Sequence, residues 1–576
     1  NSADIKKYSD DYALNEMVAK LLSIRKKNIE DIGLFLNPTI KKLLPNPLSL
    51  KDMENAIERT YQSIKKRESI GIFGDYDVDG ATSTALLTRY FLSINQKVQT
   101  YIPDRKKEGY GPSVEGFNNL MKLGVKIIFT VDCGTLSFEP VKIAQSQDID
   151  IIILDHHQSD LKLPNACAIV NPNRYDDTSK LNYLCAAGVC FMFLVALNKK
   201  LRDRNWFEEK KINEPNILNF LDLVSLGTVC DVVPLVDLNR AIVTQGLKIL
   251  KKRLNLGLKT LYDLCQIESQ PTTYDLGFAL GPRINAGGRV GKSSHGVNLL
   301  ISDDPKKTYQ IALDLEKYNQ ERKSIEFILS EKIHSEVKNF HNYPVLVLSG
   351  NNWHEGIIGI VAARIKDKYN KPTILISLDN KLGKGSARSV FGFDIGKQII
   401  KASQLGILKK GGGHKMAGGF TIEKEKIDLF REFLIKNFIK TKFFKCLSFI
   451  ENIKNTQFDI IALPGGLPGA EYLRDSKCLD MMIKNQADSG RLLGAICASP
   501  AVVLEPKGLL TGINATCHPA CRSPLGDRFN GKRVSVTDNI ITSQGPGTAM
   551  EFALKLVELG LGKTKRDEIA MPMITQ

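Results

Sequence analysis

Residues 74–80 read Gly74-Asp75-Tyr76-Asp77-Val78-Asp79-Gly80, and they join a strand-like run to a helix-like run. Residues 69–73 form a short apolar run of strand length, and residues 81–92 have helical periodicity. Open α/β folds place their sites where such strands end and the following helices begin. This stretch therefore predicts an α/β fold and also the position of its chemistry.

Two later apolar runs end in the same kind of residue. Residues 125–131 precede Asp132, and residues 149–154 precede Asp155-His156-His157. A fourth acid, Asp231, follows the apolar segment 223–229. If the ends of these segments are neighbours, one cleft gathers a set of anionic and imidazole groups, namely Asp77, Asp79, Asp132, His156 and Asp231.

That many acidic groups cannot all stay ionised in one cleft without cations, so the pattern predicts a pair of divalent metal ions. Carboxylate-rich ligation with one imidazole suits Mn²⁺ or Mg²⁺ better than Zn²⁺, which prefers more nitrogen or sulfur. A calcium loop of the EF-hand type needs Glu at its twelfth position, and counting from Asp75 that position is Leu86.

These motifs resemble the DHH phosphoesterases and, within them, the RecJ group of single-strand-specific 5′ exonucleases. Further matching segments over residues 10–440 are Pro103-Asp104-Arg105, Gly109-Tyr110-Gly111, Leu280-Gly281-Pro282-Arg283-Ile284-Asn285, Trp353-His354-Glu355-Gly356, Gly385-Ser386-Ala387-Arg388-Ser389 and Gly412-Gly413-His414. The resemblance implies two-metal hydrolysis of phosphodiester bonds in single-stranded DNA, with Mn²⁺ or Mg²⁺ as cofactor and a role in DNA repair and recombination. It also implies that the five residues of the cleft are metal ligands, with Asp75 close by and His157 on the scissile phosphate.

A second set of residues is expected to contact nucleic acid. Five of them are expected in glycine-bearing loops, where backbone can approach a ligand closely: Arg283, Asn285, Arg289, Arg388 and His414. The resemblance implies that these residues and Arg105 follow the DNA backbone, and that Ser386 and Arg388 form a 5′-phosphate pocket. The alternative is that the arginines only pair with carboxylates between lobes.

The expected organisation is a DHH-type parallel-sheet domain and a second α/β lobe joined by a long helix, then a smaller α/β unit. The expected boundaries are a helical cap over 1–65, the catalytic domain over 66–240, a connecting region with the long helix over 241–340, a DHH-associated nucleic-acid-binding domain over 341–440, a junction over 441–457 and the last unit over 458–576.

Residues 458–576 resemble the flavodoxin-like ThiJ/PfpI superfamily. The matching pieces are Ala462-Leu463-Pro464-Gly465-Gly466, Ala495-Ile496-Cys497-Ala498, Cys517-His518-Pro519 and Thr542-Ser543-Gln544-Gly545. The resemblance implies a possible second site, with Cys497 as a reactive thiolate on a tight turn and His518 nearby. Residues 441–457 offer no segment for the family's opening strand and its glutamate, so this unit is expected to be truncated.

Composition narrows the class of protein further. The 576 residues carry a net charge of +16, and residues 1–450 hold 65 Lys+Arg against 50 Asp+Glu, which favours a polyanionic partner. Eleven cysteines without a Cys-x-x-Cys pair favour a reducing, cytoplasmic location, and no apolar stretch is long enough to cross a membrane. The alternatives left open are a strand-binding protein without catalysis, a ThiJ-type thiol enzyme (a deglycase or stress protein) and a phosphodiesterase acting on oligonucleotides.

Overall fold

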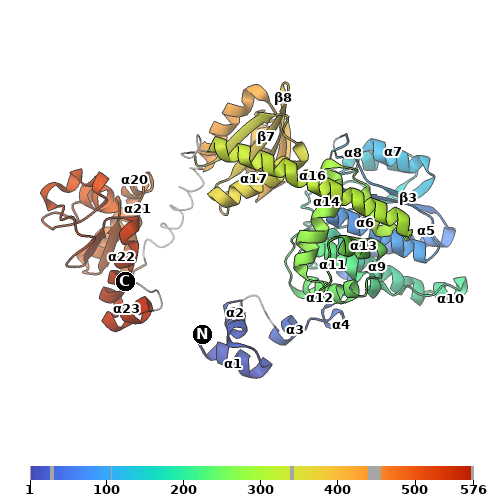
Figure 1. Cartoon of the computed structure of the whole chain (residues 1–576), viewed down its shortest axis with the longest axis horizontal. Coiled ribbons are helices and arrows are strands. Elements are labelled where there is room, and N and C mark those ends of the chain that lie inside the picture. Colours follow the sequence, from blue (N-terminus) through green and yellow to red (C-terminus); the bar gives the residue numbers. More distant parts are fainter. Residues whose placement is uncertain are drawn as a thin grey trace. The chain divides into compact units, whose positions relative to one another are not determined.

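The computed structural model describes residues 2–25, 31–105, 107–109, 111–337, 343–438 and 456–571. The chain divides into two compact units, Asn1–Lys332 and Ile333–Gln576 (Figure 1). The boundary falls within one long helix, α16 (Pro305–Val337), which matches the long helix expected before residue 340. Tyr110 and residues 441–455 of the expected junction lie outside the described residues.

The first unit opens with helices, as its sequence predicts. They are α1 (Ser2–Tyr12), α2 (Glu16–Arg25), α3 (Ile32–Leu36), α4 (Ile40–Leu43), η2 (Pro47–Ser49) and α5 (Met53–Lys66). The last of these is strongly amphipathic and buries Met53, Ile57 and Ile64 in the main core. The N-terminal segment is therefore anchored to the sheet domain by α5.

A five-stranded parallel sheet forms the centre of this unit. Its strands lie in the order β2-β1-β3-β4-β5, with bounds β1 (Ser69–Gly74), β2 (Val98–Tyr101), β3 (Val125–Val131), β4 (Asp150–Leu154) and β5 (Ala168–Val170). The chain moves in opposite directions after β1 and after β3, so the carboxyl ends of these two strands flank the topological switch point. Asp75 and Asp132 directly follow those two ends.

Helices cover both faces of the sheet (Figure 1). On one face, α7 (Val114–Lys122) and α8 (Phe138–Gln145) close a core that includes Phe117 and Val141. On the other, the larger core lies under α5, α6 (Val78–Ser93), α9 (Ala186–Asp203) and α11 (Leu221–Cys230). Strands β1, β3, β4 and β5 are largely buried, which explains why their sequences are mostly apolar, whereas the edge strand β2 is half-buried.

Further helices complete the first unit: α10 (Trp206–Lys210), η3 (Ile217–Phe220), α12 (Asp237–Lys251), α13 (Leu256–Leu264), η4 (Asp275–Leu280), α14 (Gly281–Val290) and α15 (His295–Ile301). The expectation that Arg283, Asn285 and Arg289 lie in a glycine-bearing loop is wrong, because all three are on α14. Pro282 is at the start of this helix, where proline is tolerated. A Cβ on Gly288 would lie 2.9 Å from the Tyr76 carbonyl oxygen, so glycine here permits close packing against the acidic loop.

Helix α11 carries a buried acid whose titration affects the stability of this unit. Burial raises the pKa of Asp222 from 3.8 to about 6. The folded state therefore holds a proton that the unfolded state releases, and stability falls as the pH rises from 4 to 6, by about 3 kcal/mol in total. Asp222→Asn removes this dependence. We expect its thermal midpoint, relative to wild type, to rise between pH 4 and pH 7, and a constant difference would contradict the expectation.

The second unit contains two separate sheets. The first has the order β6-β7-β8-β10-β9, with bounds β6 (Leu346–Asn351), β7 (Thr373–Asp379), β8 (Leu382–Arg388), β10 (Ala417–Glu423) and β9 (Lys410–His414). Only the β6–β7 pair is parallel. Helices α17 (Glu355–Tyr369) and α18 (Ile395–Gln404) flank the sheet. Arg388 and His414 were expected in loops, and they instead end β8 and β9.

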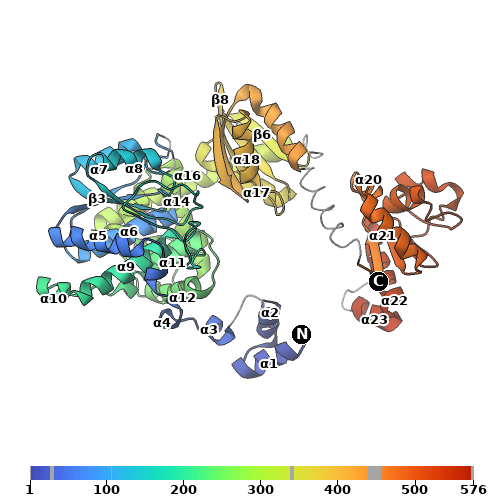
Figure 2. The same ribbon diagram turned by 180° about the vertical axis from the view of Figure 1, so that it is seen from behind.

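The other sheet has the order β11-β12-β14-β13, with bounds β11 (Ile460–Leu463), β12 (Leu492–Ile496), β14 (Ile540–Ser543) and β13 (Val534–Thr537). The first three strands are parallel and β13 is antiparallel. Helices α20 (Gly469–Arg474), α21 (Lys477–Asp488), α22 (Ala549–Leu561) and α23 (Lys563–Ala570) complete this α/β unit (Figure 2). Among the described residues, no helix combines the length and apolarity needed to cross a bilayer.

Candidate metal centre

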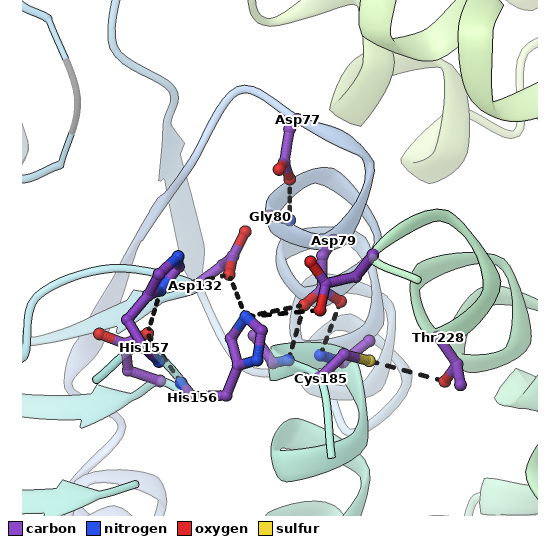
Figure 3. A network of polar contacts seen from close by, with 12 residues as sticks. Asp77, Asp79, Gly80, Asp132, His156, His157, Cys185 and Thr228 are labelled. Carbon is purple, nitrogen blue, oxygen red and sulfur yellow. Dashed lines mark hydrogen bonds and ion pairs between the residues drawn. The ribbon is translucent and has the colours of Figure 1, made fainter. Parts of the chain in front are cut away.

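The acidic loop after β1 is held in place by two helix ends. Asp77 caps α6, since its Oδ1 accepts a hydrogen bond from the Gly80 N–H at 3.0 Å. Asp79 lies in the first turn of α6, and its two carboxylate oxygens accept hydrogen bonds from the N–H groups of Ala186 and Ala187 at the start of α9, at 2.6 and 3.0 Å (Figure 3). Both carboxylates are therefore fixed by backbone donors.

His156 lies among three carboxylates that come from three different elements (Figure 3). Its Nε2 atom is 3.3 Å from Asp132 Oδ1, 3.7 Å from Asp231 Oδ2 and 3.8 Å from Asp79 Oδ2. Asp132 has a left-handed backbone with φ of 60°, a strained conformation that is common at functional sites. Asp231 ends helix α11 rather than a strand, so the apolar run 223–229 is a buried helix.

The expected metal-binding residues thus come together in space. Three groups of side chains have ligand atoms within 4.8 Å of one another: Asp75 with Asp77 and Asp132, Asp79 with His156 and Asp231, and Asp132 with His156 and His157. These groups include all five expected ligands together with Asp75 and His157. Their oxygen-rich composition matches the preference of Mn²⁺ or Mg²⁺.

The acids of this cluster are poorly stabilised as anions by the protein alone. Burial and the negative charge of Asp77 raise the pKa of Asp75 well above its usual range. The same two causes raise the pKa of Asp132 well above its usual range. Burial and Asp79 raise the pKa of Asp231 to about 8. A divalent cation would stabilise the ionised forms of all three.

Two buried polar atoms provide a direct test of whether a cation fits. Within the described part of the chain, Asp75 Oδ1 and His156 Nε2 have no hydrogen-bond partner although both are buried. Buried polar atoms without a partner are costly, so the position of these two among carboxylates suits coordination of a cation. The residues present fit a divalent cation.

His157 is held by Asp155, a residue that sequence reasoning did not assign to the site. Its Nδ1 is 2.8 Å from Asp155 Oδ1, and its side chain is 46% exposed. Burial alone lowers the pKa of His157, but the hydrogen bond and charge of Asp155 raise it to about 9. The Asp155 carboxylate also accepts hydrogen bonds from Thr135 and from the backbone of His156. In the metal-free protein, the Asp155 contact therefore favours the protonated form of His157 at neutral pH.

Gly227 on α11 is another residue that the sequence did not single out. A Cβ there would lie 2.7 Å from Asp79 Oδ1, 2.6 Å from Thr82 Oγ1 and 2.9 Å from Ala187 Cβ. Any side chain would displace the Asp79 carboxylate from its place beside α9 and His156.

We therefore expect Gly227→Ala to lower Mn²⁺ affinity by about tenfold or more, because misplacing one ligand weakens the whole site. Calorimetric titration with Mn²⁺ measures this effect. Gly124→Ala is a control, because a Cβ on Gly124 meets no atom within 4 Å, although its φ of 75° makes that variant mildly strained. Equal Mn²⁺ affinities for Gly227→Ala and wild type would contradict the prediction.

The expected nucleic-acid contacts of the first unit lie in different surroundings. Arg105 stacks on the Tyr76 ring, with its guanidinium carbon 5.1 Å from the ring centre. Burial raises the pKa of the Tyr76 phenol to about 12, and the positive charges of Arg105 and Arg289 oppose this rise. Arg289 is therefore also near Tyr76. Arg283 instead pairs with Glu316 and the Ala279 carbonyl, so it does pair with a carboxylate, but within one unit and not between lobes. Asn285 is half-buried on the same helix.

In the second unit, Ser386 and Arg388 lie together on β8. The Arg388 guanidinium donates to Ser386 Oγ at 3.2 Å, and a Cβ on Gly359 of α17 would lie within 3.0 Å of both side chains. Arg388 and His414 also face the same residue of β10, since each is paired in register with Ala417. The sheet thus brings the three predicted side chains to one end.

The Cys497 turn has the strained geometry that its sequence predicts. Cys497 follows β12 with φ of 64°, and a Cβ on Gly465 would lie 2.2 Å from its Cβ, so only glycine fits there. The His518 N–H donates to the Cys497 carbonyl at 2.8 Å. A Cβ on Gly545 would contact both the His518 ring and the Cys497 sulfur, at 3.4 and 3.9 Å. The thiol and the imidazole therefore border one small space.

Comparison with known families agrees with the division of the chain into a parallel-sheet domain, a second α/β lobe and a C-terminal α/β unit. Residues 69–228 match the DHH family, N-terminal domain, and residues 342–440 match the DHHA1 domain. The single-stranded-DNA-specific exonuclease RecJ of Escherichia coli is 37% identical over 411 residues, which cover 69% of this chain and 70% of that protein. The chain belongs to the RecJ family.

Other RecJ proteins show the same relationship. The Bacillus subtilis protein of that name is 34% identical over 428 residues, covering 73% of this chain but only 52% of its own length. A crystal structure of RecJ from Thermus thermophilus in complex with Mn²⁺ matches with a TM-score of 0.64 at 26% identity, covering 76% of this chain and 61% of that one. This RecJ-family chain thus spans about half to two thirds of the length of several relatives.

The C-terminal unit of this RecJ-family chain matches a different family. Residues 436–559 match the DJ-1/PfpI family, and Protein DJ-1 homolog B of Arabidopsis thaliana is 44% identical over 127 residues. That alignment covers 22% of this chain and 29% of the plant protein. The chain is therefore a fusion of RecJ-type domains with a DJ-1/PfpI domain, as its sequence indicates.

Proposed function

We propose that this chain is a Mn²⁺- or Mg²⁺-dependent exonuclease that hydrolyses single-stranded DNA from its 5′ end, in DNA repair and recombination. The observation that carries the proposal is the convergence of four carboxylates and His156 around atoms that lack hydrogen-bond partners within the described residues; these side chains come from the start of α6 and from the ends of β3, β4 and α11. The RecJ relatives named as single-stranded-DNA-specific exonucleases support the substrate, and the Mn²⁺-bound relative supports the cofactor.

Two divalent ions at this centre would activate a water molecule and neutralise the charge that develops on the phosphoryl oxygens. The proposed ligands are Asp77, Asp79, Asp132, His156 and Asp231. Asp75 would lie beside them as a further acid. His157, kept cationic by Asp155 and partly exposed, would donate a hydrogen bond to the scissile phosphate.

The remaining predicted residues would bind the strand. Arg105 and Arg289 lie close to Tyr76 in the acidic loop, where they would attract phosphates toward the metal centre. Ser386 and Arg388 would hold the terminal 5′-phosphate, and His414 a neighbouring phosphate. Asn285 and Arg283 would support strand binding indirectly. Arg283 would do so through its pairing with Glu316.

The basic surplus of residues 1–450 supports a DNA partner. A cytoplasmic location is supported by the described cysteines, ten thiols that are all free, since reducing compartments keep thiols in that state. The domain boundaries expected from the sequence, 66–240 for catalysis and 341–440 for strand binding, are part of the same proposal.

The proposal is tested by incubating the full chain with Mn²⁺ and a 5′-labelled single-stranded 30-mer. Wild type should release labelled mononucleotide, Cys497→Ala should behave like wild type, and Asp77→Ala should release almost none. A 3′-labelled strand checks the polarity, and a blunt duplex checks the strand preference. Comparison with di- and trinucleotides tests the alternative of an oligonucleotide phosphodiesterase. A wild-type chain that cleaves no strand with either metal would refute the proposal.

The geometry around Cys497 favours a second activity for the C-terminal unit, that of a ThiJ/PfpI-type cysteine enzyme such as a deglycase. The strained turn leaves Cys497 only partly buried and places its thiol near the His518 ring, as nucleophilic catalysis requires. Release of adducts from a glycated peptide should then disappear in Cys497→Ala and persist in Asp77→Ala. Activity that survives in Cys497→Ala would exclude this second function.

A further inference from the structure

Two aromatic rings on the surface of the first unit stack on each other without being covered. Tyr274 and Phe278 are 67% and 70% exposed. Their ring centres are 4.8 Å apart, and the ring planes differ by 26°. Exposed aromatic side chains of this kind give up few existing contacts when a ligand binds to them. They gain apolar burial in return.

The backbone holds this pair rigidly. Phe278 lies on η4, a π-helical segment, and such segments are frequent at functional sites. Its neighbours Leu276 and Leu280 are fully buried, so they anchor the opposite side of the helix. Thr272 donates hydrogen bonds to the Asp275 carboxylate from both its N–H and its Oγ1, each at 2.8 Å, and so fixes the start of the segment.

The segment packs against α11, the helix that ends at Asp231 of the metal centre. The Cys230 thiol donates to the Leu276 carbonyl at 3.4 Å, and a Cβ on Gly281 would lie 2.4 Å from that sulfur. The next residue after Cys230 is the proposed ligand Asp231. η4 also runs without a break into α14, where Gly288 packs on the backbone of Tyr76 in the acidic loop. The continuous helical run η4–α14 thus contacts Cys230, next to Asp231, and Tyr76 of the acidic loop.

We propose that Tyr274 and Phe278 form a platform on which unpaired bases of the DNA strand stack. Stacking of a base on an aromatic ring contributes about 1–3 kcal/mol and does not depend on sequence, because every base has a π face. A paired base in a duplex has both faces covered by its neighbours, so the platform would favour single strands. This inference rests on the proposed function and adds the residues that select the form of the substrate.

Binding of fluorescein-labelled oligo(dT) to the full chain, measured by anisotropy in EDTA, tests the platform without cleavage. The double variant Tyr274→Ala/Phe278→Ala should bind about tenfold or more weakly than wild type. Both proteins should bind an abasic strand of the same length equally, because that strand keeps its phosphates and lacks its bases. Tyr274→Phe and Phe278→Tyr keep the rings and should bind like wild type.

Tyr309→Ala on α16 is the matched control, since it removes another half-exposed ring of the same unit and should change nothing. Thermal unfolding checks that the double variant is folded, as expected for side chains so exposed. Equal affinities of folded double variant and wild type for oligo(dT) overturn the platform, even if wild type cleaves DNA and the proposed function holds. If wild type instead binds strands but cleaves none, the exonuclease proposal fails while the platform stands.

Discussion

Asp132→Asn is expected to abolish Mn²⁺-dependent hydrolysis, with kcat at least about 1,000-fold below wild type, roughly 4 kcal/mol of lost transition-state stabilisation. Asp132 belongs to two of the three groups of candidate ligands and lies 3.3 Å from His156 Nε2. An amide removes one anionic ligand and presents N–H donors where a cation would bind. The rate of mononucleotide release at saturating DNA measures the effect.

Asp176→Asn is the matched control for this change. Asp176 is a half-exposed carboxylate paired with Arg174, outside the candidate groups, and its replacement should leave kcat within about twofold of wild type. Thermal unfolding distinguishes loss of the site from loss of the fold. An Asp132→Asn chain that is folded and retains a tenth of wild-type activity would show that this carboxylate does not hold a required ion.

Asp155→Asn is expected to have the second largest effect, although Asp155 is not a proposed ligand. Its carboxylate accepts hydrogen bonds from Thr135 and the His156 N–H, and it contacts His157 Nδ1. The amide of asparagine would direct its own N–H groups at some of these donors and lose those hydrogen bonds. We expect kcat to fall about 100-fold, as is typical when a group that orients metal-site residues is removed. The thermal midpoint of the variant should fall as well.

The same variant should change the titration of His157 in the metal-free protein. In wild type the imidazole stays protonated up to about pH 9, because Asp155 stabilises the cation. In Asp155→Asn the pKa should fall toward the ordinary value of 6.5, which NMR of the imidazole protons measures. An unchanged pKa would mean that other carboxylates, such as Asp77 or Asp231, maintain the charge.

The sequence was sufficient to predict those parts of the structure that depend on the pattern of neighbouring residues. Continuous apolar runs predicted β1, β3 and β4, and the acids that follow them predicted the place of the metal centre, because parallel strands end at one edge. It was misleading for α14, where glycine and proline usually break helices. There the close approach of Gly288 to Tyr76 stabilises the helix through a tertiary contact that no local pattern contains.

The residues that support the ligands were also beyond sequence reasoning. Asp155 holds the adjacent His156 and His157 and is itself bonded to the distant Thr135, and Gly227 contacts Asp79, which is far from it in the sequence. Asp155 stands in the Asp155-His156-His157 motif, but that motif does not distinguish a supporting aspartate from a ligand, and a helical glycine such as Gly227 has many structural uses. Asp231 was predicted as a ligand through family resemblance, whereas its helical setting became clear only from the fold.

The most direct measurement is an anomalous difference map at the manganese edge from crystals grown with Mn²⁺. The account predicts two peaks, one bounded by Asp75, Asp77 and Asp132 and the other by Asp79, His156 and Asp231. A map with no peak at these side chains, in crystals where the carboxylates are ordered, would contradict it.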